Sequence, residues 1–331
     1  MTTLEYEGWK YIYKGGQFKV ESSIEDKKIS PKSLFKYYGV SKYSVDAFLK
    51  RYLYAAHPDE LNDLYDFNSD LLGFTGSEEE IDFLYQFLRK NGLNREKREF
   101  REDISSGKSL SYIQIFKKLF KEKLSERLGV ISLSNNPESI PMWSYYAQNK
   151  GFMLEFDTSE LNLQGVPYGP FPVHYPVTHK QIHFSDVKRE SLNEIKLYAL
   201  FLAMITTKTK DWKHEDEWRY LVEGEKDKKS LFYEDGDKVI SGRSRCFGYN
   251  VHAIKSITFG ARFFKDITKD TDTRVVFTTR DSQTQKIVND ALKSGFKLFI
   301  IREGIIVFKL HRVPLTLTPM ESEPSIYIAE F

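Results

Sequence analysis

The sequence predicts an α+β fold in which a bent or split central mixed sheet carries a helical insertion and a C-terminal strand–helix–strand extension. Two amphipathic helical patterns follow each other closely, one beginning at the capping sequence Ser77–Glu80 and one spanning Ile113 to Leu124. From Gly129 onward, short apolar runs alternate with single helices, which is typical of strands packed into one sheet.

These patterns divide the chain into three parts. Two short runs around a pair of glycines predict an N-terminal hairpin extension over residues 1–32. The main α+β domain is expected over 33–260, with the helical insertion at 71–128. Residues 261–331 form the predicted extension, which we expect to pack on the main domain.

Each predicted element follows from its hydrophobic period and its end signals. Pro141 suits the first turn of a helix, and Gly295 suits the residue after a helix end. The predicted helices are 139–148, 186–208 and 282–294, besides the two of the insertion. The predicted strands are 33–38, 52–56, 130–134, 151–156, 173–175, 217–222, 256–259, 297–301 and 305–310.

Composition indicates a protein of a reducing compartment that does not enter a membrane. The chain has 331 residues with one cysteine, Cys246, which excludes an intrachain disulfide and a zinc site built on paired thiolates. No apolar run is long enough to cross a bilayer, and the N-terminus lacks the order of a signal peptide. We therefore expect a cytoplasmic protein. Lys plus Arg (49) nearly balance Asp plus Glu (47), so the global charge does not indicate nucleic-acid binding.

Two short motifs resemble ligand sites but fail closer tests. Ser106–Ser109 imitates the end of a phosphate-binding loop, yet it lacks the earlier glycine and a preceding strand. His179 and His183 stand four residues apart without a third ligand of clear spacing, so they are predicted to be surface histidines. The sequence therefore predicts no metal site.

Three other segments combine polar and aromatic residues in a way that can serve a site. Asn62–Asp66 can form Asx turns or line a pocket, and Met142–Ala147 can pack in a core or against a ligand. In a strand beginning at Glu217, alternation places Glu217 and Arg219 on a face toward a cleft or solvent, while Trp218 enters the core. An ordinary surface ion pair is the alternative for these two charges, and in either case we expect folding to tolerate the loss of Arg219.

Together with Phe35–Tyr38, Ile131–Ser134 and Gly151–Asp157, these segments resemble the bacterial family known as domain of unknown function 2971, over about residues 33–259. The shared motifs are Asn-Asp-x-aromatic-Asp, Met-Trp-Ser-x-Tyr-Ala, Gly-Phe-x-x-Glu-Phe-Asp and Trp-x-x-Glu-x-Glu-Trp-Arg, in that order. Leu64 stands where the family usually has proline, and Tyr145 where it usually has histidine.

The order of these segments is also similar, more remotely, to the split sheet of ADP-ribosyltransferases. That resemblance implies that Glu217 stabilises an oxocarbenium-like transition state of NAD and that Glu215 orients or activates the acceptor. It further implies that a tyrosine stacks on nicotinamide. The site so predicted consists of catalytic Glu215 and Glu217, cofactor-binding Lys36, Tyr37, Ser134, Trp143, Tyr145 and Tyr146, and further site residues Asn62, Asp63, Asp66 and Arg219, with NAD as the cofactor.

The functional expectation is a bacterial toxin or anti-phage defence effector, with ADP-ribosyl transfer from NAD as its activity. Its partners would be a macromolecular acceptor, protein or nucleic acid, and a partner protein of a defence system. The second hypothesis is a non-enzymatic sensor or binding module of a defence or toxin–antitoxin system. A nuclease is the third; it is disfavoured because the sequence lacks a paired-carboxylate metal motif.

Overall fold

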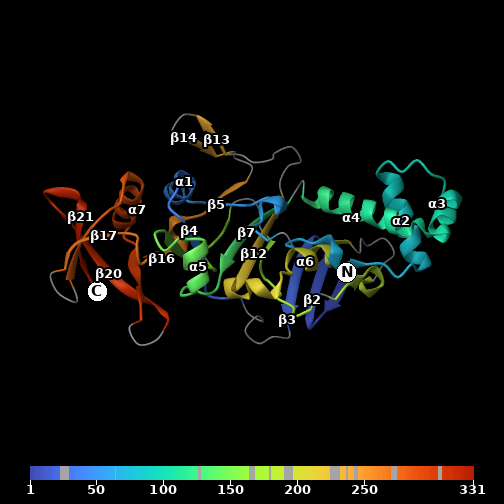
Figure 1. The fold of residues 1–331 in the computed structure, drawn as a ribbon, viewed down its shortest axis with the longest axis horizontal. Helices are drawn as coiled ribbons and strands as arrows, with labels where there is room; N and C mark the ends of the chain where they lie inside the picture. The colour runs from blue at the N-terminus through green and yellow to red at the C-terminus, as the bar shows by residue number, and fades with distance from the viewer. Residues whose placement is uncertain are drawn as a thin grey trace.

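In the computed structural model, the helical insertion lies at one end of the molecule and the C-terminal strands lie at the other, with the strands of the main domain between them (Figure 1). The structure describes residues 1–22, 30–63, 65–125, 128–163, 168–178, 180–189, 197–223, 232–235, 238–241, 245–269, 274–304 and 308–331.

Among the described residues, the main sheet has 11 strands in the order β17-β18-β21-β20-β19-β16-β8-β4-β7-β12-β9. It is mixed, because β16 and β19 run parallel while their other neighbours are antiparallel. The predicted α+β class with a large mixed sheet is therefore confirmed. The strands are β4 (Ser33–Tyr38), β7 (Leu128–Ser134), β8 (Phe152–Asp157), β9 (Tyr168–Pro172), β12 (Glu217–Glu223), β16 (Ile254–Phe259), β17 (Lys265–Lys269), β18 (Arg274–Thr278), β19 (Lys297–Glu303), β20 (Leu310–Met320) and β21 (Glu323–Glu330).

The sheet opens between β4 and β7. These two strands pair only at Phe35 and Ser134, whereas β4 pairs with β8 along its full length from Ser33 to Tyr38. Farther along β7, Val130 instead pairs with Ala56 in an isolated antiparallel β-bridge. Beyond the first pair the two backbones are therefore not bonded to each other.

A second, four-stranded sheet has the order β11-β1-β2-β3. It contains β1 (Thr2–Tyr6), β2 (Trp9–Lys14), β3 (Gln17–Ser22) and β11 (Lys188–Arg189), so the N-terminus is larger than the predicted hairpin. The predicted helix 186–208 is wrong at its start, because β11 pairs with β1 and the helix α6 is Leu197–Ile205. Residues 190–196 lie outside the described part of the chain.

The insertion contains α2 (Glu78–Lys90), α3 (Lys97–Asp103), the π-helical turn η4 (Ile104–Lys108) and α4 (Ser109–Ser125). Ser77 and Glu80 form the predicted capping box. The insertion is not purely helical, because β6 (Leu72–Gly73) pairs with β10 (Ile182–His183). Ser106–Ser109 lies in the kinked helical connection, where Gly107 has a φ of 96°.

In the described part of the C-terminal extension there are five strands and one helix, α7 (Ser282–Lys293), where the sequence predicts two strands and one helix. The predicted strand 305–310 is displaced, since β20 begins at Leu310 and 305–307 lie outside the described residues. The strand predicted at 173–175 lies earlier in the chain, because β9 spans Tyr168–Pro172.

The remaining elements connect and cover the main sheet. They are α1 (Lys42–Lys50), α5 (Ile140–Tyr145), β5 (Tyr52–Tyr54), β13 (Phe232–Asp235), β14 (Lys238–Ser241), β15 (Cys246–Gly248), and the 3₁₀ helices η2 (Pro58–Glu60), η3 (Ser69–Leu71), η5 (Phe184–Asp186), η6 (Lys210–Glu215) and η7 (Val251–Ala253). Among the described helices, none has both the length and the apolar character needed to span a membrane.

Strand β12 contributes side chains to two separate hydrophobic cores. Trp218, Tyr220 and Val222 belong to the core that also holds α7 and the C-terminal strands. Leu221 belongs to a second core shared with α6, the insertion and the N-terminal sheet. Both faces of β12 are therefore covered, which determines the environment of its charged residues.

Candidate functional site

A cavity of about 200 Å³ lies where β4 and β7 part. It gathers residues from β4, β7, β12, α5, η6 and the loop around Asn62. The predicted site residues that line this cavity are Lys36, Tyr37, Asn62, Asp66, Ser134, Tyr146, Glu215, Glu217 and Arg219.

The turn between η6 and β12 brings Glu215 and Glu217 to the same cavity. Asp216 adopts the left-handed conformation, with a φ of 42°, a geometry that aspartate tolerates better than most residues. Its backbone carbonyl accepts a hydrogen bond from the Asn135 amide at 2.9 Å. The Ser134 hydroxyl donates to the Glu215 carbonyl at 2.6 Å. Strand β7 therefore fixes the backbone on which both carboxylates are carried.

Arg219 is fully buried and is held by carboxylates on two sides. Its Nε donates to Glu217 Oε1 at 2.8 Å and its Nη2 to Glu217 Oε2 at 3.0 Å. Two further donors contact Asp66, at 2.8 Å to Oδ1 and 2.5 Å to Oδ2, and Nη1 also reaches the Ile205 carbonyl. Glu217 and Arg219 both line the cavity, and the alternative of an ordinary surface ion pair is wrong, because the second core covers that face of β12 and both side chains are buried.

Lys208 is a second buried cation of the site. Its ammonium lies 2.6 Å from Glu215 Oε2 and 3.5 Å from Glu217 Oε2. The Trp212 ring lies 4.6 Å from the same nitrogen, in cation–π geometry. The sequence interpretation missed this residue. The available signal was a lysine three residues after a helix that is apolar nearly all round, because a charge buried in such surroundings needs a partner.

Tyr146 connects the Asn62 loop to the carboxylates. Its hydroxyl donates to Glu215 Oε1, and the Asn62 side-chain amide donates to the Tyr146 oxygen at 2.6 Å. Burial raises the pKa of Tyr146, as do the nearby carboxylates, so the phenol stays protonated as the donor. These contacts join residues that are far apart in the sequence.

The two glutamates differ in their proton affinity. Burial and then the charge of Glu217 raise the pKa of Glu215, against the opposing pull of Lys208. Burial also acts to raise the pKa of Glu217, but Arg219 and Lys208 outweigh it and hold that pKa well below its ordinary value. Glu217 is therefore a fixed anion, while Glu215 can exchange a proton closer to neutrality.

Three predicted residues lie outside this cavity. Trp143 is fully buried, and its indole nitrogen donates to the Pro137 carbonyl. Tyr145 is 69% exposed and contacts the His214 ring, so Tyr146, and not Tyr145, is the tyrosine of the cavity. Asp63 accepts the Tyr65 amide at 2.9 Å, as expected of the alternative Asx turn. Leu64 and His179 lie outside the described residues.

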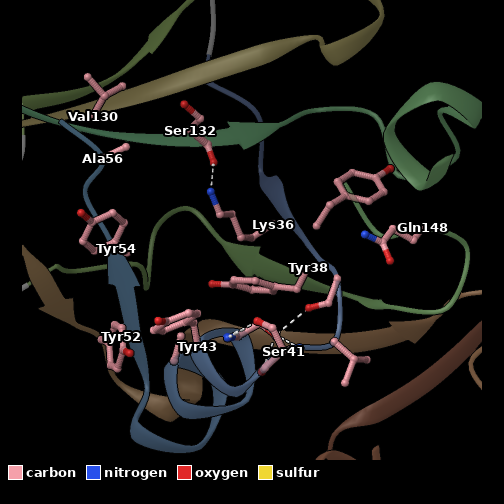
Figure 2. Close-up of a pocket in the computed structure, with 15 residues that line it drawn as sticks. Lys36, Tyr38, Ser41, Tyr43, Tyr52, Tyr54, Ala56, Val130, Ser132 and Gln148 are labelled. Carbon is pink, nitrogen blue, oxygen red and sulfur yellow. Dashed lines mark hydrogen bonds between the residues drawn. The ribbon is translucent and has the colours of Figure 1, made fainter. Parts of the chain in front are cut away.

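A larger cavity of about 470 Å³ adjoins the first one (Figure 2). Both cavities are lined by Lys36, Tyr37, Ala56 and Ser132. Within the described ranges, no group of three or more His, Cys, Asp or Glu side chains is placed to hold a metal ion.

Fold and site define an α+β protein with a charged cavity set in the opening of a mixed sheet. Residues 142–220 match the model of the family described as Protein of unknown function (DUF2971). The predicted resemblance to this family is confirmed for that segment, which contains β8, α6, η6, the end of α5 and the first part of β12. No curated protein and no solved structure matches the chain.

Proposed function

We propose that the chain cleaves the bond between nicotinamide and ribose in NAD and transfers the ADP-ribosyl group to an acceptor. The observation that carries this proposal is the pair Glu215 and Glu217, two buried carboxylates in one cavity whose pKa values are driven in opposite directions. Such a divided pair is the arrangement that glycosidic bond cleavage uses, one group as a lasting anion and the other as a proton carrier.

In this reaction, the bond from the ribose C1′ to the pyridinium nitrogen breaks, and its electron pair leaves with neutral nicotinamide. The oxocarbenium character that develops on the ribose is stabilised by anionic Glu217. An acceptor hydroxyl then forms the new bond to C1′ and gives its proton to Glu215. The raised pKa of Glu215 makes it a stronger base than an ordinary carboxylate, and the Tyr146 hydroxyl fixes its orientation.

The cellular role that we propose with this chemistry is that of a toxin or defence effector. Modification of an essential macromolecule, or consumption of NAD, stops growth. The acceptor is a protein or a nucleic acid, and a partner protein of a defence system would keep the activity in check. Support for this role comes from the resemblance of the motifs, whereas the support for the chemistry comes from the cavity.

The decisive experiment measures nicotinamide release from NAD by the purified full chain, with and without candidate acceptors. Glu215→Gln removes the proton acceptor, so transfer should fall by about a hundredfold or more. Glu160→Gln, an exposed glutamate outside both cavities, serves as the matched control and should leave the rate unchanged. Glu217→Gln should abolish both transfer and NAD hydrolysis, but it also removes a partner of Arg219, so its unfolding midpoint must be measured alongside.

A non-enzymatic binding module is the second candidate, because both oxygens of Glu217 already accept hydrogen bonds from Arg219. A fully paired network can be structural or can form the floor of a ligand site. If the wild-type chain arrests growth but releases no nicotinamide with any acceptor, the binding-module function replaces the enzyme. Degradation of nucleic acid by the purified chain would instead point to the nuclease.

A further inference from the structure

Tyrosines line the larger cavity, and the proposed cleavage of NAD at Glu215 and Glu217 assigns no function to it. Its volume of about 470 Å³ falls in the range of small-molecule sites. Figure 2 shows Tyr52 and Tyr54 on one side of the view, Gln148 on the other and Tyr38 between them. Strand β4, helix α1 and strand β5 supply most of this wall.

Several of these rings are held in place by contacts of their own. Tyr38 stacks on Phe152 with ring centroids 5.2 Å apart. The Tyr52 hydroxyl donates to Asp46 at 3.0 Å, and the Tyr54 hydroxyl donates to Glu60 at 2.8 Å. The wall is therefore aromatic and preorganised, which suits a planar ring because little side-chain freedom is lost on binding.

Lys36 stands at the junction of the two cavities. Its ammonium donates to the Ser132 carbonyl at 2.9 Å across the opening between β4 and β7 (Figure 2). An ammonium has three donors, and within the described residues this is the one hydrogen bond recorded for Lys36. Burial lowers the pKa of Lys36 despite the pull of Glu217 and Glu215, so an anionic ligand here would stabilise its charge.

A hydrogen bond of Glu60 connects the walls of the two cavities. Its carboxylate accepts the Tyr54 hydroxyl, while Glu60 itself lines the charged cavity. A single extended molecule can thus contact the tyrosine wall, pass the Lys36 ammonium and reach Glu215. A dinucleotide has this order of groups: an aromatic base, a diphosphate and a second ribose.

Gln148, which lines the tyrosine-walled cavity across the view from Tyr52 and Tyr54 (Figure 2), has a rare backbone conformation. Its φ is 52°, and Asn149 beside it has a φ of 54°. The Asn149 amide donates to the Trp143 carbonyl at 2.8 Å, and the Gly151 amide to Ala147 at 2.7 Å, which holds the turn. Left-handed non-glycine residues cost free energy, and they cluster at functional sites. A glutamine amide can pair with the donor and acceptor of an adenine edge.

We propose that the tyrosine-walled cavity binds the adenosine phosphate half of the substrate, with the base between the tyrosines and Gln148 and a phosphate at Lys36. This assignment rests on the proposed function for its account of the other half, but the cavity would bind adenosine phosphates on their own. It makes the substrate a dinucleotide, so nicotinamide mononucleotide, which lacks adenosine, should be a much poorer substrate than NAD.

The test is calorimetric titration of the full chain with AMP and with ADP-ribose. Tyr43→Ala removes a ring that is 38% exposed at the cavity wall and should raise the dissociation constant for AMP about tenfold. Tyr145→Ala is the matched control, because Tyr145 is exposed outside both cavities and its loss should leave AMP binding unchanged. Lys36→Gln should weaken AMP more than adenosine, since only AMP carries the phosphate.

Failure of this assignment and failure of the proposed function give different results. If NAD is cleaved but AMP and ADP-ribose do not bind, or bind equally well to Tyr43→Ala, the assignment is overturned and the chemistry stands. If AMP binds as expected and Glu215→Gln leaves that binding intact, but no nicotinamide is released, the adenosine site stands and the chemistry is lost. Equal binding of AMP and GMP would overturn the role of Gln148.

Discussion

Arg219 is the residue on which the buried part of the site depends most. The guanidinium is fully buried and pairs with Glu217 and Asp66, so its removal leaves two buried carboxylates without their main partner. Breaking a buried pair in this way costs about 3–5 kcal/mol. This burial reverses the expectation from the sequence that folding tolerates the loss of Arg219. We expect Arg219→Ala to lower the free energy of unfolding by that amount, comparable to the loss for Trp218→Ala, a fully buried core residue.

Chemical denaturation of both variants measures these losses. Arg98→Ala is the control, because the Arg98 side chain is 88% exposed and pairs with Glu102 only at the surface. That change should alter the free energy of unfolding by less than about 0.5 kcal/mol. If Arg219→Ala proves as mild as Arg98→Ala, the buried network does not stabilise the fold.

The pH dependence of activity depends on Tyr146. Its hydrogen bond lowers the pKa of Glu215, against burial and the charge of Glu217, which raise it. Tyr146→Phe removes the lowering contact, so the pKa of Glu215 rises further. As Glu215 must be ionised to accept a proton, the acidic limb of the rate profile should move to higher pH. Transfer rates measured across the acidic and neutral range test this, and a shift to lower pH would contradict the assignment.

The pKa values of the two glutamates shift in opposite directions on folding, so Glu215 and Glu217 have opposite effects on how stability changes with pH. The lowered pKa of Glu217 contributes stability above the ordinary glutamate pKa, and that contribution is lost as pH falls toward its folded value. The raised pKa of Glu215 has the reverse sign, so Glu215 costs stability as pH rises through its folded value. Glu215→Gln removes the second effect, and its unfolding free energy should therefore decline less than that of wild type between acidic and neutral pH.

At the scale of elements, the sequence predicted what a local period determines. The alternation in β12 correctly places Trp218 in a core, and the capping box at Ser77 begins α2 as predicted. The second core is not visible in that alternation, because it is built from α6, the insertion and the N-terminal sheet, which are distant in sequence. For the same reason, the sequence can indicate that Lys208 needs a partner but not that this partner is Glu215.

The junction between β4 and β8 depends on Gly151. A Cβ at this position would lie 1.9 Å from the Tyr38 carbonyl oxygen and 2.9 Å from that of Ala147, both of them backbone atoms. Gly151→Ala should therefore lower the free energy of unfolding by about 3 kcal/mol, as strong overpacking does. Gly295→Ala is the comparison, because Gly295 has a φ of 69° but open space around it, so it should lose only about 1 kcal/mol. Equal losses in denaturation would show that the contact relaxes easily.

At the scale of the whole molecule, the C-terminal extension shares its core with the main domain. Ile287 and Tyr327 are fully buried in the same cluster as Phe152 and Ile257. Strand β19 pairs in parallel with β16, from Ser256 with Lys297 to Phe259 with Ile300. A pairing between strands so far apart in sequence leaves no local signal, which is why the extension was predicted only to pack against the domain.

Because they share a core, we expect the main domain and the C-terminal extension to unfold as one cooperative unit. Without residues 261–331, the edge of β16 and the apolar residues of α1 that face α7 would be exposed to water, so we expect the fragment 1–260 to lack a cooperative unfolding transition. In the intact chain, hydrogen exchange should give the same opening free energy for amides of β8, β16 and β19. The two-stranded sheet β13–β14 is the internal comparison and should exchange earlier, because an isolated hairpin is marginally stable. A fragment 1–260 that melts sharply near the temperature of the full chain would contradict the shared unit and would make the extension a separate domain.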